Sequence, residues 1–303
     1  MRDDVGAWTE RVRRIEDLGY DVLSVSDHLI QGWSMDVFVT LSAAAVVTDR
    51  IRLATLVLAN DYRHPALVHR AISALDVVSA GRAELGIGTG WLAAEYRALG
   101  LTMEPPPTRI ARLEEAVRII RALYAETPLD FQGQHYRIDG LVGLPRPVQV
   151  PGPPILIGGG AQPILELAGR HADVAGFLPR RGEDGRIPAT ELSMTALRRR
   201  IDHVERGTQA AGRRPGEVRR QLGIIAWHLE GGAGPARRGW SSLGSAALLA
   251  AGADGSLPGV LVGSVETAAE HLIRWRETFG VTDIHIGSDV EAFAGVVARL
   301  GRA

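Results

Sequence analysis

The chain has 303 residues, of which 46% are hydrophobic and 23% charged, and its formal net charge is -1. This length allows a sizeable core, and the charge balance indicates neither a nucleic-acid-binding surface nor an acidic tail. No run of about 18 uninterrupted apolar residues is present, so the sequence predicts no membrane span, no signal peptide and a cytoplasmic location.

Two residue types are absent, and their absence excludes several kinds of site. The chain has no cysteine and no lysine, so all 34 residues of the lysine-plus-arginine total are arginine. Without cysteine there is no disulfide, thiol nucleophile or thiolate zinc site, and without lysine there is no Schiff-base enzyme or P-loop. The nine histidines include no His-x-His pair at a strand end. We therefore expect no metal site, and a metal-dependent hydrolase is the weaker enzyme alternative.

The first half of the chain alternates helices with short apolar strands. Hydrophobic periodicity predicts helices over Trp8–Leu18, Asp36–Val47, Ala66–Val78 and Arg109–Ala125, and a helical turn near Leu92–Leu99. Strands are predicted over Asp21–Ser26, Ile51–Leu58 and Arg82–Ile87, and a small hairpin over Phe131–Ile138.

The second half continues the alternation, with inserted segments near 128–150, 179–190 and 231–258. Strands are predicted over Ile155–Ile157, Asp173–Phe177, Val218–Leu229 and Val281–Ile286. Helices are predicted over Pro163–Arg170, Glu191–Ala211, Val265–Phe279 and Val290–Leu300. The stretch Gly231–Pro258 is interpreted as a mobile lid or a poorly ordered insertion that, with the loop Pro179–Pro188, sets specificity.

Strands separated by long helices predict right-handed βαβ units and a parallel sheet. Eight long helices and seven strands favour a single α/β domain over residues 1–303, a (β/α)8 TIM barrel. Residues Met1–Gly6 are too polar and too few to form a buried first strand. We therefore expect the first barrel strand to be absent from this sequence, either through a start site placed too late or in a barrel open between its second and eighth strands.

Three strand ends carry residues typical of ligand sites. Asp27 and His28 follow the strand Asp21–Ser26, and the carboxyl ends of parallel strands are where ligands gather; the alternative is a loop cap with a satisfied histidine. The segment Gly86–Gly90 lacks the third glycine of a dinucleotide fingerprint, which favours a tight turn. Gly158–Gly160 precede a helix, where backbone amides bind anions, although a turn is again the alternative.

Several other residues are candidates for a substrate pocket. Arg63 could pair with a carboxylate or phosphate, and Glu95 could pair with an arginine or cap a short helix. Tryptophans that fall in the predicted strand-end loops could form the wall of an apolar pocket, or could simply pack in the core: Trp33, Trp91, Trp227 and Trp240.

A set of motifs in this order resembles the luciferase-like flavin-dependent family, and within it the deazaflavin (coenzyme F420)-dependent oxidoreductases of actinobacteria. The similarity is dense from about Trp8 to Phe177 and resumes in Val260–Ser264 and the final strand and helix. The matching segments are Asp17–Leu29, Arg52–Leu58, His64–Pro65, Leu75–Arg82, Leu85–Trp91, Glu95–Tyr96 and Pro154–Gly160.

The resemblance implies a barrel with a flavin-like ring standing across its C-terminal mouth. In it, His28 would donate or accept a proton, and a cis peptide between Leu56 and Val57 would support the face of the ring. Other cofactor contacts implied by position are Asp27, Thr89, Gly90, Gly158, Gly159 and Gly160, and the implied substrate pocket contains Trp33, Trp91 and Glu95.

The resemblance also implies an activity, with alternatives. The first is hydride transfer between coenzyme F420 and a small organic substrate in a homodimeric enzyme. The second is an FMN-dependent monooxygenase, which uses FMNH2 made by a separate flavin reductase. The third is an inactive barrel truncated at its N-terminus. Some sugar dehydrogenases of this family carry a carboxylate where this chain has Trp91, and they grip the sugar phosphate with lysines. We therefore expect a substrate other than a sugar phosphate.

Overall fold

The computed structural model describes residues 5–30, 35–180, 187–230 and 245–301. The chain divides into two compact units, residues 1–157 and 158–303. Strand β7 (Ile155–Gly159) runs across the division between them. Each unit is described by itself.

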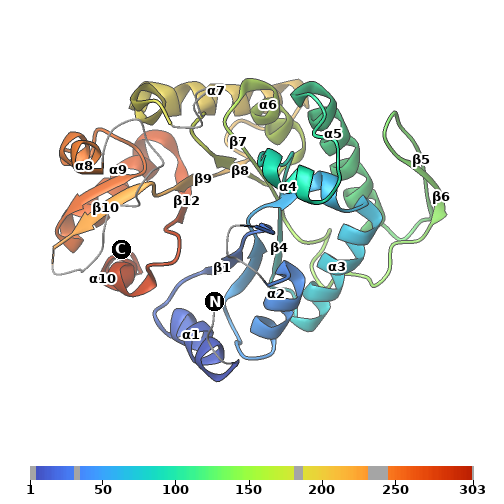
Figure 1. Ribbon diagram of the computed structural model, residues 1–303, viewed down its shortest axis with the longest axis horizontal. Helices are drawn as coiled ribbons and strands as arrows, with labels where there is room; N and C mark the ends of the chain where they lie inside the picture. The colour runs from blue at the N-terminus through green and yellow to red at the C-terminus, as the bar shows by residue number, and fades with distance from the viewer. Residues whose placement is uncertain (1–4, 31–34, 181–186, 231–244, 302–303) are drawn as a thin grey trace. The chain divides into compact units, whose positions relative to one another are not determined.

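The first unit is a parallel sheet with helices packed against it (Figure 1). Its helices are α1 (Val5–Asp17), α2 (Val37–Ala45), α3 (Pro65–Val78), α4 (Ala93–Ala98) and α5 (Pro106–Leu123). Its sheet strands are β1 (Val22–Val25), β2 (Arg52–Thr55), β3 (Leu58–Ala59), β4 (Ala83–Gly88) and the start of β7. These strands are parallel in the order β1-β2-β4-β7, and β3 also pairs with β4.

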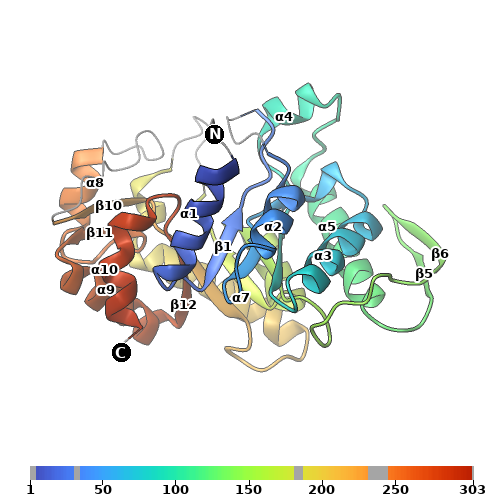
Figure 2. The same cartoon turned by 90° about the horizontal axis from the view of Figure 1, so that it is seen from below.

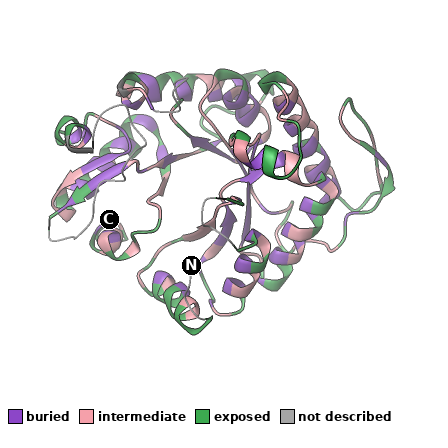
Figure 3. Cartoon of the chain, viewed as in Figure 1, coloured by how far each residue is buried: buried purple, intermediate pink, exposed green. Residues whose placement is uncertain are grey.

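Local sequence explains where the helices of this unit begin and which face they bury. Asp36 caps α2 by accepting hydrogen bonds from the amides of Phe38 and Val39, which satisfies donors that the first turn leaves open. Pro65 occupies the first turn of α3, where its missing N–H costs nothing. The sheet-facing sides of the helices are buried and their outer sides are exposed (Figure 3), as amphipathic helices on a sheet require.

A hairpin of β5 (Leu129–Gln132) and β6 (Arg137–Leu141) projects beyond α5 in Figure 1. Glu115 of α5 anchors its turn by accepting hydrogen bonds from the amides of Gln134 (2.7 Å), His135 (3.0 Å) and Tyr136 (3.1 Å). The predicted hairpin is confirmed, and Glu115 ties its turn to α5.

In the second unit, strands β8 (Val174–Phe177), β9 (Arg219–Gly223) and β12 (Val281–His285) lie parallel in the order β8-β9-β12. Strands β10 (Ala226–Leu229) and β11 (Val260–Gly263) pair in parallel as a separate two-stranded sheet. Its helices are α6 (Gln162–His171), α7 (Met194–Ala210), α8 (Ser245–Gly252), α9 (Val265–Phe279) and α10 (Val290–Leu300), with a 3-10 turn at Ala189–Leu192.

Helices α6 and α7 pack through two glycines. A Cβ on Gly169 would lie 2.1 Å from the Val204 carbonyl oxygen, and one on Gly207 would lie 2.0 Å from that of Glu166. Since no side chain fits at either position, the helix backbones themselves are in contact.

Several predicted elements need correction. Ile51–Leu58 is not one strand, because it is interrupted at Leu56 and Val57 between β2 and β3. Val218–Leu229 is also wrong as one strand: the Ile224 amide bonds to the carbonyl of His285, whereas the Ile225 amide bonds to that of Gly259. The chain thus changes sheets between two consecutive residues.

The predicted lid at 231–258 lies partly outside the described residues, but its end forms α8, and the strand β11 after it was not predicted. The α/β class with parallel strands is confirmed. The missing first strand stays a prediction, and β1 is the first strand among the described residues. None of the described helices has the length and apolar character needed to cross a bilayer.

Candidate active site

Asp27 stands just after β1 and is held by Arg63. The two guanidinium nitrogens donate to its carboxylate oxygens at 2.6 and 2.9 Å, and the Ala59 amide donates at 3.2 Å. Asp27 is only 7% exposed. Since a bidentate charge-assisted pair is strong and directional, Asp27 anchors the end of β1 to β3 and to the turn that follows it. In the described structure Arg63 pairs with a carboxylate of the chain itself, and its predicted pairing with a ligand stays a prediction.

His28 is held by Glu95 of α4, which is 2% exposed. Its Nδ1 atom lies 3.1 and 3.2 Å from the two carboxylate oxygens of Glu95. The same carboxylate accepts hydrogen bonds from the amides of Leu29 (2.7 Å) and Ile30 (3.4 Å) and from the hydroxyl of Tyr62 (3.2 Å). Glu95 therefore pairs with a histidine and a loop backbone, rather than with the arginine considered from sequence.

These contacts determine the ionisation of the cluster. Burial alone would raise the pKa of Glu95, but hydrogen bonds from the Leu29 amide and the His28 ring outweigh it and hold that pKa below its usual value. Burial, together with the nearby Glu95 carboxylate, raises the pKa of Tyr62. At neutral pH the cluster consequently contains an ionised Glu95 and a protonated Tyr62.

Trp91 is the aromatic candidate that the structure places at this site. Its ring meets the His28 ring edge-on with centroids 5.7 Å apart, and 49% of the residue is exposed. Trp227 is instead buried in β10. It packs in the core and does not form a pocket wall. Trp33 and Trp240 lie outside the described residues.

The peptide bond between Leu56 and Val57 is cis, as the resemblance implies. It lies beside β1, since the Leu56 amide donates to the Val25 carbonyl at 2.8 Å. A Cβ on Gly86 would lie 2.1 Å from the Thr55 carbonyl oxygen. Gly86 in β4 therefore has to be a glycine, because the backbone of β2 passes close to it just before the interruption at Leu56 and Val57. The sequence patterns did not indicate this reason.

Thr89 and Gly90 directly follow β4, and Gly90 has a φ of +74°, which favours glycine. Arg109 donates to the carbonyl oxygens of Thr89 (3.1 Å) and Gly90 (2.5 Å), and the Tyr96 hydroxyl lies 3.0 Å from the former. Tyr96 also donates to Asp61 at 2.9 Å. Tyr96 and Arg109 were not singled out from the sequence; the one available signal was that Tyr96 lies within a family-like segment.

Gly159 and Gly160 have a structural explanation within the second unit. A Cβ on Gly159 would lie 2.4 Å from the Ile164 side chain, and one on Gly160 would lie 2.2 Å from the Leu178 carbonyl oxygen. Packing thus excludes side chains here, and the anion-binding role stays a prediction.

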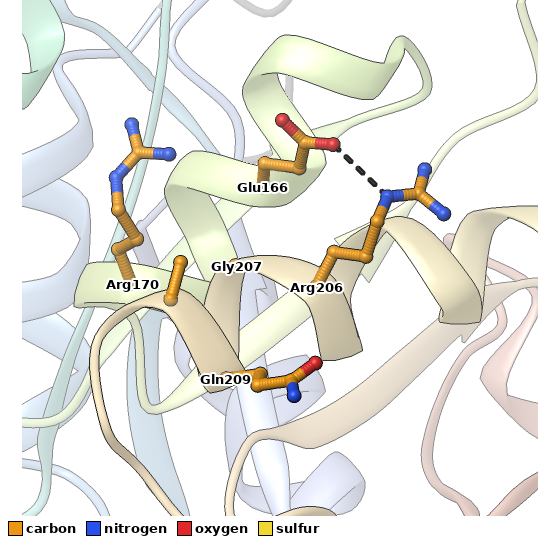
Figure 4. A pocket seen from close by; sticks show the side chains of 6 residues that line it. Glu166, Arg170, Arg206, Gly207 and Gln209 are labelled. Carbon is orange, nitrogen blue, oxygen red and sulfur yellow. Dashed lines mark hydrogen bonds and ion pairs between the residues drawn. The ribbon is translucent and has the colours of Figure 1, made fainter.

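A separate hollow of about 420 Å³ lies on the surface of α6 and α7 (Figure 4). Its lining is charged, and its Arg206 donates to Glu166 at 3.2 Å across the two helices. It contains none of the predicted site residues. Among the described residues, no group of three or more histidine or acidic side chains is arranged to hold a metal ion.

Figure 2 shows α4, which carries Glu95, standing apart from α2 and α3 of the first unit. This placement at the strand ends is where the family resemblance puts the ligand. The family model for luciferase-like monooxygenases matches residues 3–282 of this chain.

The chain belongs to the luciferase-like monooxygenase family.

Members and structural neighbours of the luciferase-like family show how far the similarity reaches. An F420-dependent glucose-6-phosphate dehydrogenase of Kineococcus radiotolerans is 34% identical over 215 residues, which is 69% of this chain and 60% of that protein. The chain thus spans about 60% of the length of this curated relative.

Two solved structures share the fold. Monooxygenase RslO1 from Streptomyces bottropensis has a TM-score of 0.74 at 23% identity, covering 96% of this chain and 90% of its own. The coenzyme F420-dependent tetrahydromethanopterin reductase of Methanopyrus kandleri has a TM-score of 0.75 at 17% identity, covering 99% and 96%.

Proposed function

We propose that this chain is a coenzyme F420-dependent oxidoreductase built on the luciferase-like (β/α)8 barrel, with His28 as its proton carrier. The observation that carries the proposal is the pair of half-buried His28 and buried Glu95 just after β1, the strand to whose Val25 the cis Leu56–Val57 segment is hydrogen-bonded. The names of curated relatives, which are F420-dependent dehydrogenases, support the choice of cofactor.

The residues of the first unit fit a planar, largely apolar ring. Leu56 and Val57 are half-buried, whereas Thr55 and Leu58 on either side are buried. An apolar surface is thus left partly open next to the end of β1, three residues before His28, which suits a ring with a proton carrier at its edge. Leu56, Val57, Thr89 and Gly90 would hold it, and the role of Gly158–Gly160 stays a prediction from the family resemblance.

When bound, coenzyme F420 supplies the hydride acceptor or donor. In the oxidative direction, the substrate carbon loses a hydride and its hydroxyl loses a proton, so that the C–O single bond becomes a carbonyl. His28 takes that proton, and it returns the proton in the reverse direction. Glu95 keeps the imidazole in place, and Trp91 limits the movement of the ring from another side.

The competing proposal is an FMN-dependent monooxygenase, for which the RslO1 likeness shows only a shared fold. Titrating the protein with F420 and with FMN separates the two, because binding quenches flavin fluorescence. Replacing His28 with Ala should leave F420 binding largely intact and lower turnover by about 10²–10⁴-fold.

Turnover should be assayed with glucose 6-phosphate and with uncharged secondary alcohols. Binding of FMN without F420 would overturn the cofactor assignment, and unchanged turnover of the His28 variant would remove His28 from the mechanism. The cytoplasmic location, the homodimer and the sugar-phosphate exclusion stay predictions.

A further inference from the structure

We propose that Glu95 is a positioning residue that fixes the tautomer of His28, so that the neutral ring carries its proton on Nδ1 and exchanges protons with substrate through Nε2. The catalytic consequence of this inference rests on the proposed function. The tautomer itself does not, since it follows from the hydrogen bonds of the folded chain.

The first step is to count donors around the Glu95 carboxylate. Backbone amides can only donate, and those of Leu29 and Ile30 both point at Oε1. The Tyr62 hydroxyl is 3.2 Å from Oε2, and its raised pKa keeps it protonated. A carboxylate facing these donors is the acceptor in each hydrogen bond.

The second step concerns the His28 ring. Its Nδ1 is 3.1 Å from Oε1 and 3.2 Å from Oε2, so the nitrogen approaches the carboxylate nearly symmetrically. An ionised carboxylate has no hydrogen to give, so Nδ1 has to be the donor. In a neutral imidazole the other nitrogen is then the base.

The third step is that neither partner can easily rearrange. Glu95 is 2% exposed, which leaves little room for water to replace the histidine. Its neighbour in α4, Tyr96, is tied to Asp61 and the Thr89 carbonyl. Turning the His28 ring over would place a carbon atom against the carboxylate and sacrifice a charge-assisted hydrogen bond. The pair is therefore preorganised before any ligand arrives.

The test is the isosteric substitution Glu95→Gln. The introduced amide oxygen can still accept from the Leu29 amide, and its NH2 group then faces Nδ1 of His28 as a donor. This donor stands where Oε2 lay 3.2 Å from Nδ1, so it favours acceptance on Nδ1 and a proton on Nε2. Substitution of an orienting carboxylate by its amide in a well-studied triad lowers turnover by about 10⁴-fold through the wrong tautomer.

Nitrogen-15 NMR of histidine-labelled protein without ligand reports which ring nitrogen carries the proton. We expect Nδ1–H for His28 in the wild type and in Glu95→Asp, and Nε2–H in Glu95→Gln. Turnover of Glu95→Gln should fall by about 10²–10⁴-fold with little change in the KM for F420, and Glu95→Asp should recover part of it.

The matched control is Glu115→Gln, because Glu115 also accepts three backbone amide hydrogen bonds in the same unit, but at the β5–β6 hairpin. It should change neither the His28 tautomer nor turnover. An Nε2–H tautomer in the wild type, or unchanged turnover of Glu95→Gln, overturns the inference even if the enzyme uses F420. Failure of the wild type to bind or reduce F420 counts against the proposed function alone.

Discussion

His69 is expected to make the first unit sensitive to acid, and the effect can be calculated from its surroundings. It lies on the buried face of α3, 1% exposed, with Nε2 3.3 Å from the Ser73 hydroxyl. Burial lowers its pKa to about 4, with a further lowering from Arg146, although a hydrogen bond to the Leu123 carbonyl opposes the shift.

The sign and size of the effect follow from proton linkage. In the unfolded chain His69 has its ordinary pKa of 6.5 and is protonated below that pH. In the folded chain it becomes protonated only near pH 4. The contribution of His69 to stability is therefore complete above pH 6.5 and is lost as the pH falls. Between pH 7 and pH 5 this loss is about 2 kcal/mol in the free energy of unfolding.

The assay is urea unfolding of wild type and His69→Gln at pH 7 and pH 5, followed by far-UV circular dichroism. The variant should lose about 2 kcal/mol less than the wild type over this interval, whatever its stability at pH 7. His228 is exposed on β10, so His228→Gln serves as the control and should keep the wild-type dependence. Equal pH dependences for wild type and His69→Gln would refute the reasoning.

Two further predictions concern the frame of the candidate site. Arg63→Ala leaves the carboxylate of Asp27, whose side chain is 4% exposed, without its cation; it should lower the free energy of unfolding by about 3 kcal/mol, and Asp27→Asn in the same chain should restore part of that loss. A loss within about 0.5 kcal/mol of zero, the range of ordinary surface substitutions, would contradict this. Gly86→Ala forces a Cβ to 2.1 Å from the Thr55 carbonyl and should cost about 1–3 kcal/mol and weaken F420 binding. Gly223→Ala meets no atom within 4 Å and is its control in the same unfolding and fluorescence titrations; equal losses for the two variants would disprove the steric argument.

Most helices could be predicted because their signals are local. Val265–Phe279 and Val290–Leu300 have the predicted bounds. In the first, Ser264 accepts from the Thr267 amide and Gly280 ends the helix in the left-handed conformation. Caps and amphipathic periodicity act over a few residues, so they are readable from one sequence.

Strand limits were less predictable, because a strand depends on its partner. The apolar run Val218–Leu229 gives no local sign that its two halves pair with different strands, and β11 follows a segment rich in glycine and alanine. The pairing of β9 with β12 and of β10 with β11 joins residues far apart in the chain. Such long-range choices are not encoded in periodicity.

At the candidate site, the sequence by itself determined the chemical groups available: an Asp-His pair after a strand, no lysine and no thiol, and a motif order that places the chain in its family. Only the tertiary structure decided that His28 meets Glu95, 67 residues away, and that Asp27 is neutralised by Arg63. The physical reason is that strand register and the placement of α4 bring these groups together. A buried carboxylate takes whichever donors that packing presents, and no local pattern specifies them.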